Sequence, residues 1–278
     1  MNRYRVIEGL KEKQGTTWDI IIIGGGATGL GIALDAASRG YKTLLLEQSD
    51  FAKGTSSRST KLVHGGVRYM AQGDLMLVME ALHERGILLR NASHLTFNQE
   101  FVIPVYTKFD VIKYTAGLKF YDLLAGRLSL GRSYFMNKQE TVRRLPLIRK
   151  KGLKGSIVYH DGQFDDSRLA IALAAQTLRH GGVVLNYCSV TGFEKNSEGR
   201  ITGLTAVDKL SGESYSFKTR LVINATGVFA DEIAKMDDSS SRRTIRPSQG
   251  VHLVIDKSFL QSDSAIMIPK TDDGRVLF

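Results

Sequence analysis

Hydrophobic residues near the start of the chain form first a strand-like and then a helix-like pattern. Four consecutive isoleucines, Ile20 to Ile23, predict a strand that is buried on both faces. Residues 27–39 then repeat apolar side chains with a helical period, and Gly40 follows where a left-handed cap costs little. A second apolar strand is predicted at 43–46. This order of elements predicts an α/β fold.

Three glycines connect the first strand to the helix. Gly24, Gly26 and Gly29 have the spacing G-x-G-x-x-G, which permits a tight turn, close backbone approach to a pyrophosphate, and close packing of helix on strand. Glu47 ends the second strand, where a carboxylate accepts hydrogen bonds from a ribose 2′-hydroxyl and would repel a 2′-phosphate. The pattern indicates a Rossmann-like domain for NAD or FAD rather than NADP. A glycine-rich loop without a ligand is the alternative.

The pattern changes twice in the rest of the chain. Helices are predicted at 74–90 and 111–128, on either side of a strand at 100–107. Pro104 interrupts this strand, so we expect it at a sheet edge or a bulge. From Val183 the period becomes two, with short strands separated by Gly, Asn and Ser turns. This last region predicts a β-meander.

A polar segment follows the second strand. Residues 48–70 contain few large apolar side chains and many hydroxyl groups, together with Arg58, Lys61, His64 and Arg68. Such a segment is either a solvated loop or the lining of a polar site. It leaves the sheet at the carboxyl end of a strand, where ligands bind in open α/β sheets, and this position favours a site.

Residues 54–70, GTSSRSTKLVHGGVRYM, closely resemble the signature of FAD-dependent glycerol-3-phosphate dehydrogenases and oxidases, a family of D-amino-acid-oxidase-like flavoproteins. The resemblance covers essentially the whole chain and about the first half, the N-terminal portion, of a full-length member. It implies a non-covalent FAD and the oxidation of sn-glycerol 3-phosphate to dihydroxyacetone phosphate, with hydride passing from C2 to flavin N5. The electrons would then pass to a quinone or to O2.

The resemblance also implies two discontinuous domains. A Rossmann-like FAD-binding domain with a β-meander insertion would comprise residues 1–90 and 160–243. A partial α+β substrate or cap domain with an antiparallel sheet, incomplete at its C-terminus, would comprise residues 91–159 and 244–278. The segment DGQFDDSRL, 161–169, would join the substrate region back to the flavin domain, and we assign its aspartates no chemistry.

Three residues of the signature are candidates for the reaction itself. Arg68 presents a planar fork of donors suited to phosphate oxygens, and Tyr69 beside it offers a phenolic donor. The resemblance implies substrate contact at both positions. His64 is a candidate general base because an imidazole titrates near working pH. A histidine that orients the flavin or the loop is the alternative at this position.

The expected cofactor contacts comprise the glycine turn, the acid that follows it, the hydroxyl-rich loop, the meander and the end of a later strand. The last three follow from the resemblance, in which a strand ending in Ala-Thr-Gly makes a second flavin contact. We expect no metal ligands. The expected FAD-binding residues are Gly24, Gly26, Ala27, Thr28, Gly29, Glu47, Gln48, Thr55, Ser56, Ser57, Lys61, Val190, Ala225, Thr226 and Gly227.

Composition narrows the class of partner. The 278 residues carry a formal net charge of +10, which suits nucleic acid, an anionic membrane surface or a phosphorylated substrate. We expect no nucleic-acid partner, because no recognition module is visible. The single cysteine, Cys188, excludes an internal disulfide, and the start of the chain has no signal-peptide pattern. Together these features favour a reducing, cytoplasmic location.

Several alternatives stay open. The basic amphipathic helix at 111–128 either packs on its own domain with a solvated basic face or docks on a membrane surface, which would make the protein peripheral on the inner face of the cell membrane. A homodimer is also open. The alternative functions are another D-amino-acid-oxidase-like oxidoreductase acting on an amino acid or a 2-hydroxy acid, and an inactive truncated fragment of the enzyme.

Overall fold

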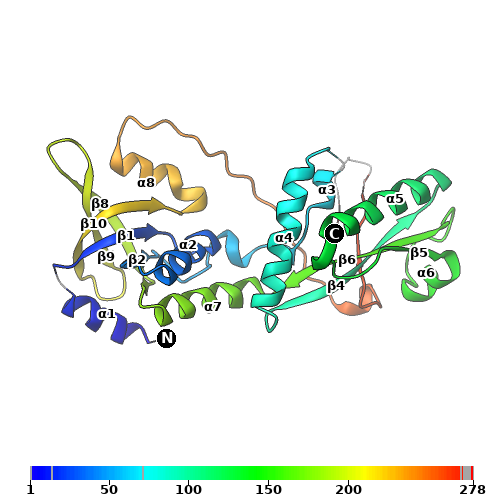
Figure 1. Cartoon of the computed structure of the whole chain (residues 1–278), viewed down its shortest axis with the longest axis horizontal. Helices are drawn as coiled ribbons and strands as arrows, with labels where there is room; N and C mark the ends of the chain where they lie inside the picture. Colours follow the sequence, from blue (N-terminus) through cyan, green and yellow to red (C-terminus); the bar gives the residue numbers. More distant parts are fainter. Residues whose placement is uncertain (1, 14, 71, 270, 272–276, 278) are drawn as a thin grey trace. The chain divides into compact units, whose positions relative to one another are not determined.

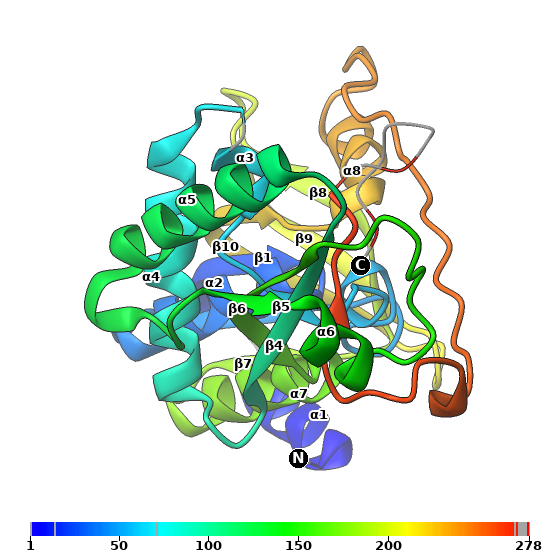
Figure 2. The same ribbon diagram turned by 90° about the vertical axis from the view of Figure 1, so that its right-hand side faces the viewer.

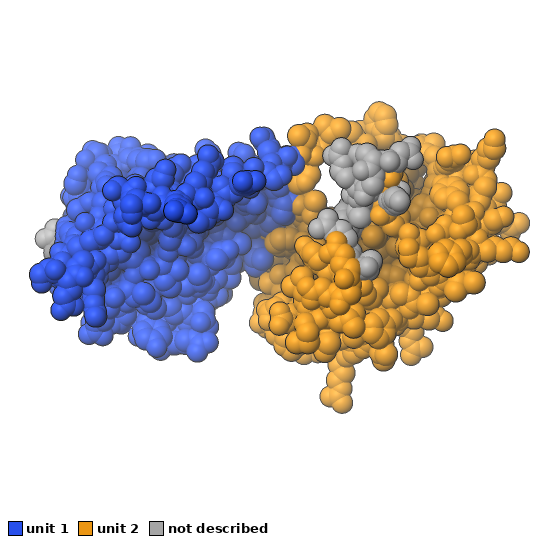
Figure 3. Space-filling view, turned by 90° about the horizontal axis from the view of Figure 1, so that it is seen from above, with its two compact units in different colours: residues 1–59, 166–250 blue, residues 60–165, 251–278 orange. Residues whose placement is uncertain are grey.

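The chain forms two compact units, each built from two segments (Figure 3). The first unit is Met1–Ser59 with Asp166–Gly250, and the second is Thr60–Asp165 with Val251–Phe278. Figure 1 shows the order of the helices and strands. The structure is a computed structural model that describes, apart from the side chain of Arg68, residues 2–13, 15–70, 72–269, 271 and 277.

These limits differ from the predicted domain boundaries at residues 90, 160 and 243. Residues 60–90 were expected in the nucleotide-binding domain, but they belong to the second unit. The reason is strand pairing and packing. β3 (Leu62–Val63) pairs with β6 (Gly155–Phe164), and α4 (Leu75–Asn91) contributes Val78 and Leu82 to the core of the same unit.

A six-stranded sheet forms the centre of the first unit, in the order β7-β2-β1-β10-β9-β8. The first four strands in this order are parallel, and β10, β9 and β8 form an antiparallel meander. The predicted α/β fold with a β-meander is therefore confirmed. The strands are β1 (Thr17–Ile23), β2 (Thr43–Leu46), β7 (Val183–Leu185), β8 (Cys188–Lys195), β9 (Ile201–Asp208) and β10 (Ser214–Asn224).

Helices cover both faces of this sheet. Ile21 and Ile23 of β1 lie in a core that includes Leu10 of α1, whereas Ile22 lies in a second core that includes Leu30 of α2 and side chains of α7. The isoleucine run is therefore buried on both sides, as predicted. The helices of this unit are α1 (Arg3–Glu12), α2 (Ala27–Ser38), α7 (Asp166–Arg179) and α8 (Ala230–Asp237).

The second unit contains a five-stranded sheet in which β11, β4, β6 and β3 lie in that order and β5 also pairs with β6. All of these pairs are antiparallel except β11 with β4. This arrangement confirms the predicted antiparallel sheet of an α+β region. The strands not yet given are β4 (Thr96–Val105), β5 (Tyr134–Asn137) and β11 (Ala265–Ile266).

The two faces of this second sheet pack against different helices (Figure 2). On one face, α4 and α5 pack on Phe101 and Ile157, and on the other, Val102 and Val158 form a smaller core with Leu145, which follows α6. The helix predicted at 111–128 corresponds to α5, which together with α4 covers one face of this sheet. The helices not yet given are α3 (Val67–Met70), α5 (Lys108–Ala125) and α6 (Lys138–Arg144).

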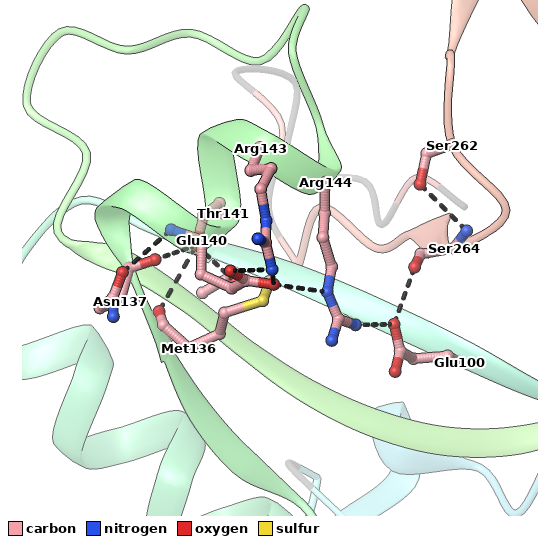
Figure 4. A network of polar contacts seen from close by, with 10 residues as sticks. Glu100, Met136, Asn137, Glu140, Thr141, Arg143, Arg144, Ser262 and Ser264 are labelled. Atoms are coloured by element: carbon pink, nitrogen blue, oxygen red, sulfur yellow. Dashed lines mark hydrogen bonds and ion pairs between the residues drawn. The ribbon is translucent and has the colours of Figure 1, made fainter.

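A polar network joins α6 to β4 (Figure 4). Glu100 of β4 accepts hydrogen bonds from Arg144 Nη1 at 2.7 Å and from Ser264 Oγ at 2.8 Å. Arg144 Nε and Arg143 Nη2 both donate to Glu140, and the hydrogen bond from Arg143 is the main cause that lowers the pKa of this carboxyl group. The network holds the segment that leads into β11 beside β4.

The prediction that Pro104 interrupts its strand is wrong. β4 continues through Pro104, which pairs with Ser156 of β6. The pairing of β4 with β11 involves Phe101 and Val102, so among the described residues Pro104 has a strand neighbour on one side. A missing N–H costs little at such a local edge, and the strand therefore tolerates the proline.

Candidate functional site

The glycine turn between β1 and α2 leaves no room for side chains at two positions. Gly24 has a φ of +112°, and a Cβ there would lie 2.5 Å from the carbonyl oxygen of Ala225. A Cβ on Gly29 would lie 1.9 Å from the carbonyl oxygen of Gly24. Both contacts are with backbone, which cannot move aside without distorting the sheet. The turn, the start of α2 and the end of β10 therefore form one packed unit.

The acid that follows β2 is fixed against this turn. Glu47 Oε2 accepts a hydrogen bond from Gly25 N at 2.6 Å, and its Oε1 accepts one from Ser49 N at 2.7 Å. A Cβ on Gly25 would lie 2.7 Å from the Cβ of Glu47. Each carboxylate oxygen retains a lone pair for a ribose hydroxyl. Sequence reasoning missed Gly25, although three glycines in succession were a visible signal.

The hydroxyl-rich loop lies against the first residues of α2. Ala27 N donates to Ser56 Oγ at 2.9 Å, and a Cβ on Gly26 would lie 3.0 Å from the same oxygen. Gly26 is the N-cap of α2 and has no side-chain cap of its own, and Thr28 in the first turn is exposed. The positive end of the helix dipole is therefore flanked by small residues and hydroxyl groups, as binding of a pyrophosphate requires.

A buried carboxylate anchors the far end of this loop. Asp166, the first residue of α7, is 4% exposed and accepts from Ser59 Oγ at 2.7 Å and from Ser59 N at 3.3 Å. Sequence reasoning missed this contact, because the two residues are far apart along the chain. Asp166 thus positions the short 3-10 turn that contains Ser56.

The end of β10 meets the glycine turn. Ala225 N donates to Ile23 O at 2.8 Å, Thr226 Oγ1 donates to Asn224 Oδ1 at 2.7 Å, and Gly227 has a φ of +58°. The structure thus brings the predicted second flavin contact beside the first. It also leaves Gln48 and Thr55 exposed and Ser57 half-buried on the same unit.

Val190 differs from the other predicted cofactor residues, because its side chain is buried in the core of the first unit. A cofactor contact at this position would therefore use its backbone.

Four predicted site residues belong to the second unit. Lys61 has a left-handed φ of +61°. His64 Nδ1 accepts a hydrogen bond from Gly66 N at 3.1 Å, so the proton of the neutral ring lies on Nε2. Tyr69 N donates to Gly66 O at 2.8 Å at the start of α3. The side chain of Arg68 lies outside the described part of the structure.

Sequence reasoning missed three buried polar residues beside the turn at Gly65 and Gly66, which precedes α3. Arg85, Tyr121 and Asp161 are all 2% exposed or less, and Arg85 and Tyr121 both donate hydrogen bonds to Asp161. They come from α4, α5 and β6. Arg85 is one of several charged residues of α4, so the sequence of this helix alone could not have pointed to the cluster.

The model of the FAD dependent oxidoreductase family matches residues 19–278. The chain belongs to this family. The "probable glycerol-3-phosphate dehydrogenase, mitochondrial" of Caenorhabditis elegans is 42% identical over 273 residues, which are 95% of this chain and 38% of that protein. The mitochondrial glycerol-3-phosphate dehydrogenase of Homo sapiens is also 42% identical, over 94% of this chain and 38% of that protein.

A solved structure is similar over nearly the whole chain. The glycerol-3-phosphate dehydrogenase of Bacillus halodurans, complexed with FAD, is 30% identical and has a TM-score of 0.74, over 99% of this chain and 47% of that one. The chain therefore spans less than half the length of each of these three proteins.

FAD, the cofactor of this family, fits the first unit. The three glycines at Gly24 to Gly26 and the start of α2, whose N-cap glycine has no capping side chain of its own, suit its pyrophosphate, and the fixed carboxylate of Glu47 suits its ribose. The bound group supplies a two-electron acceptor. Within the described residues, no group of three or more His, Cys, Asp or Glu side chains is placed to hold a metal ion.

Proposed function

We propose that this chain carries the flavin-binding part and a substrate-binding part of an FAD-dependent enzyme that oxidises sn-glycerol 3-phosphate to dihydroxyacetone phosphate. The supporting observation is 42% identity, over nearly the whole chain, to proteins named glycerol-3-phosphate dehydrogenase. The signature at 54–70 lies within that similarity. The electron acceptor in this proposal is a quinone or O2.

In this proposal, each group on the second unit has one task. The oxidation removes a hydride from C2 and a proton from the C2 hydroxyl group, which leaves a ketone. Arg68 binds the phosphate through its planar guanidinium, and Tyr69 donates a hydrogen bond to the substrate. His64 takes the hydroxyl proton. Its hydrogen bond from Gly66 N uses Nδ1, so proton transfer at Nδ1 would require this bond to open.

In this proposal the predicted FAD-binding residues act on the first unit and through Lys61. The pyrophosphate lies against Gly24, Gly26, Ala27, Thr28 and Gly29, and the ribose against Glu47 and Gln48. The remaining contacts come from Thr55, Ser56, Ser57 and Lys61, from the backbone of Val190, and from Ala225, Thr226 and Gly227.

The test is the visible spectrum of the FAD-loaded full chain under anaerobic conditions. Glycerol 3-phosphate should bleach the flavin band at about 450 nm, whereas glycerol, which lacks the phosphate, should not at equal concentration. Bleaching by glycine, L-proline or lactate in place of glycerol 3-phosphate would instead favour an amino-acid or 2-hydroxy-acid oxidoreductase. A chain that takes up no FAD would refute the proposal for this chain and leave the inactive-fragment alternative.

A matched pair of variants tests the phosphate clamp. Arg68→Lys keeps the charge but loses the two-pronged geometry, so the substrate concentration for half-maximal bleaching should rise about 10-fold. Arg58→Lys changes an exposed arginine of the same signature and should leave that concentration unchanged. Equal effects of the two substitutions would remove Arg68 from the substrate site.

We also propose that α5 docks on an anionic membrane surface, so that the protein is peripheral on the inner face of the cell membrane. Phe109, Ile112 and Leu123 of α5 are 71%, 69% and 73% exposed, and lysines lie on the same helix. The opposite side of α5 is buried in the core of the second unit. Among the described residues, no helix is long and apolar enough to cross a bilayer. An apolar stripe flanked by lysines suits the membrane interface.

Vesicle sedimentation tests this docking. The chain should sediment with phosphatidylglycerol vesicles and much less with phosphatidylcholine vesicles. The double substitution Ile112→Glu with Leu123→Glu should abolish binding. The matched control, Ile171→Glu with Leu210→Glu, changes two exposed apolar residues of the first unit and should bind like the unmodified chain. Unchanged binding of the α5 variant would refute the proposal.

A further inference from the structure

A buried carboxylate in the second unit collects four hydrogen bonds. Asp161 of β6 is 2% exposed. Its Oδ1 accepts from Arg85 Nη1 at 2.9 Å, from Gly65 N at 3.1 Å and from Gly162 N at 3.1 Å. Its Oδ2 accepts from Tyr121 Oη at 2.9 Å. One acidic side chain therefore joins α4, α5 and β6 to the backbone of the signature segment.

A buried ion pair stabilises a core less effectively than apolar side chains of the same volume. Burying an ion pair costs desolvation energy that an apolar replacement of equal volume would not incur. Arg85 is 1% exposed, and its Nε is buried without a hydrogen-bond partner among the described residues. Tyr121 is 1% exposed, and burial, with the charge of Asp161 as the next cause, raises the pKa of its phenol well above the ordinary value. The phenol thus remains a donor, and the network has a fixed geometry.

What the network fixes is the turn before α3. A Cβ on Gly65 would lie 2.3 Å from Tyr121 Oη and 2.3 Å from Leu82 Cδ2, so this glycine is pressed against the network from the side. Its N–H is held by Asp161. Gly66 follows with a φ of +76°, donates to His64 and accepts from Tyr69. Any displacement of Gly65 would therefore change the directions of both neighbours.

We propose that Asp161, Arg85 and Tyr121 are positioning residues, which hold the Gly65-Gly66 turn and through it the backbone of His64 and of α3 in place for the reaction with the substrate. This inference rests on the function proposed above. The three residues do not touch the substrate, and they act through the backbone of the turn. Their contribution should therefore appear in the rate of flavin reduction more than in FAD binding.

The decisive variant is Tyr121→Phe, which removes one oxygen atom and keeps the ring. The chain offers a matched control, since Tyr159 is 2% exposed in the same core and donates its hydroxyl to Met267 Sδ at 3.2 Å. Its ring lies 6.5 Å from that of Tyr121, centroid to centroid. Tyr159→Phe therefore loses a buried hydroxyl beside the network but leaves the hydrogen bonds of Asp161 intact.

Two readouts are needed, both on the FAD-loaded full chain. Under anaerobic stopped-flow conditions with saturating glycerol 3-phosphate, Tyr121→Phe should reduce its flavin about 10-fold more slowly than Tyr159→Phe. By hydrogen exchange, a peptide spanning residues 60–70 should exchange faster in Tyr121→Phe than in Tyr159→Phe, because Asp161, the acceptor of Gly65 N, loses one of the hydrogen bonds that hold its carboxylate in place.

The outcomes separate this inference from the proposed function. Equal reduction rates and equal exchange in the two variants would overturn the positioning role, as would a loss in Tyr121→Phe explained wholly by a lower folded fraction. If the unmodified chain binds FAD but glycerol 3-phosphate does not reduce it, the proposed function fails instead. The exchange comparison still reports on the turn in that case.

Discussion

Two glycine turns, one in each unit, are held by different means. The turn at Gly24 to Gly29 in the first unit is fixed by backbone against backbone, with side chains excluded by contacts as short as 1.9 Å. The turn at Gly65 and Gly66 in the second unit is fixed by a buried carboxylate and its partners from three elements. Backbone packing gives a rigid cradle for a pyrophosphate. A side-chain network orients particular groups, and it fails when one member changes.

The largest expected effect is on the side-chain network. Asp161→Ala leaves the Arg85 guanidinium buried without its counter-ion, so the free energy of unfolding of the second unit should fall by about 3 to 5 kcal/mol. Hydrogen exchange of peptides from β6 and α4 would measure this unit separately from the first. The matched control is Asp263→Ala in the same unit, which breaks an ion pair with Lys257 that is exposed on both sides. Its exchange should match the unmodified chain, and a similar loss in both variants would contradict the assigned role of burial.

The backbone turn should respond to a single methyl group. Gly29→Ala places a Cβ against Gly24 O, so we expect the first unit to lose about 2 to 3 kcal/mol and to retain FAD poorly. Trp18, the single tryptophan of the chain, is buried in this unit, so its fluorescence reports the unfolding of the unit. Gly31→Ala, in the same helix, meets no atom within 4 Å and should stabilise the unit by about 0.5 to 1 kcal/mol. Destabilisation by both would mean that helix geometry, and not the close contact, matters.

A smaller effect is expected from Glu47→Gln. The amide keeps one acceptor oxygen, but it turns an NH2 group toward a backbone N–H that now donates to a carboxylate oxygen. We expect the dissociation constant for FAD to rise about 10-fold, which corresponds to about 1.4 kcal/mol. Flavin fluorescence during titration measures this constant. An unchanged constant would show that the carboxylate serves the fold alone.

The smallest effect concerns alkaline pH and the first unit. Burial, followed by the charge of Asp208, raises the pKa of the Cys188 thiol to about 12. Between about pH 9 and 12 the unfolded chain has lost this proton and the folded chain has kept it, so stability falls as pH rises. Cys188→Ala should make this fall shallower in Trp18-detected denaturation. It should not abolish the fall, because the pKa of Tyr215 is also raised to about 12, mainly by burial. A slope identical in the variant would contradict the burial of the thiol.

The contrast between the two turns also explains which features could be predicted from the sequence. The glycine turn, the buried strand of Ile20 to Ile23 and the meander all follow from local spacing, and the structure forms each of them as predicted. The position of Glu47 directly after the second strand follows from the same spacing. The boundary between the units could not be read. β3 has two residues, and its partner β6 lies about a hundred residues later, so no local pattern assigns residues 60–90 to the second unit.

The residues that hold the site in place could not be predicted either, because their contacts are between residues far apart in the sequence. Asp166 meets Ser59, and Asp161 meets Gly65, Arg85 and Tyr121, across long stretches of chain. The resemblance pointed to the residues on the turn, such as His64 and Tyr69. It did not point to the residues that hold the turn, because these lie on the buried sides of two helices and on a strand, outside the signature. Their roles depend on the tertiary fold, which no periodicity encodes.

The most direct test of this account compares Glu47→Gln with Tyr121→Phe in two measurements, the dissociation constant for FAD and the rate of flavin reduction by saturating glycerol 3-phosphate. We expect each variant to change a different one of these two quantities. Glu47→Gln should raise the constant about 10-fold and leave the rate unchanged once FAD is saturating, whereas Tyr121→Phe should lower the rate about 10-fold and leave the constant unchanged. If both variants change the same quantity, the two turns do not have separate tasks and the account is wrong.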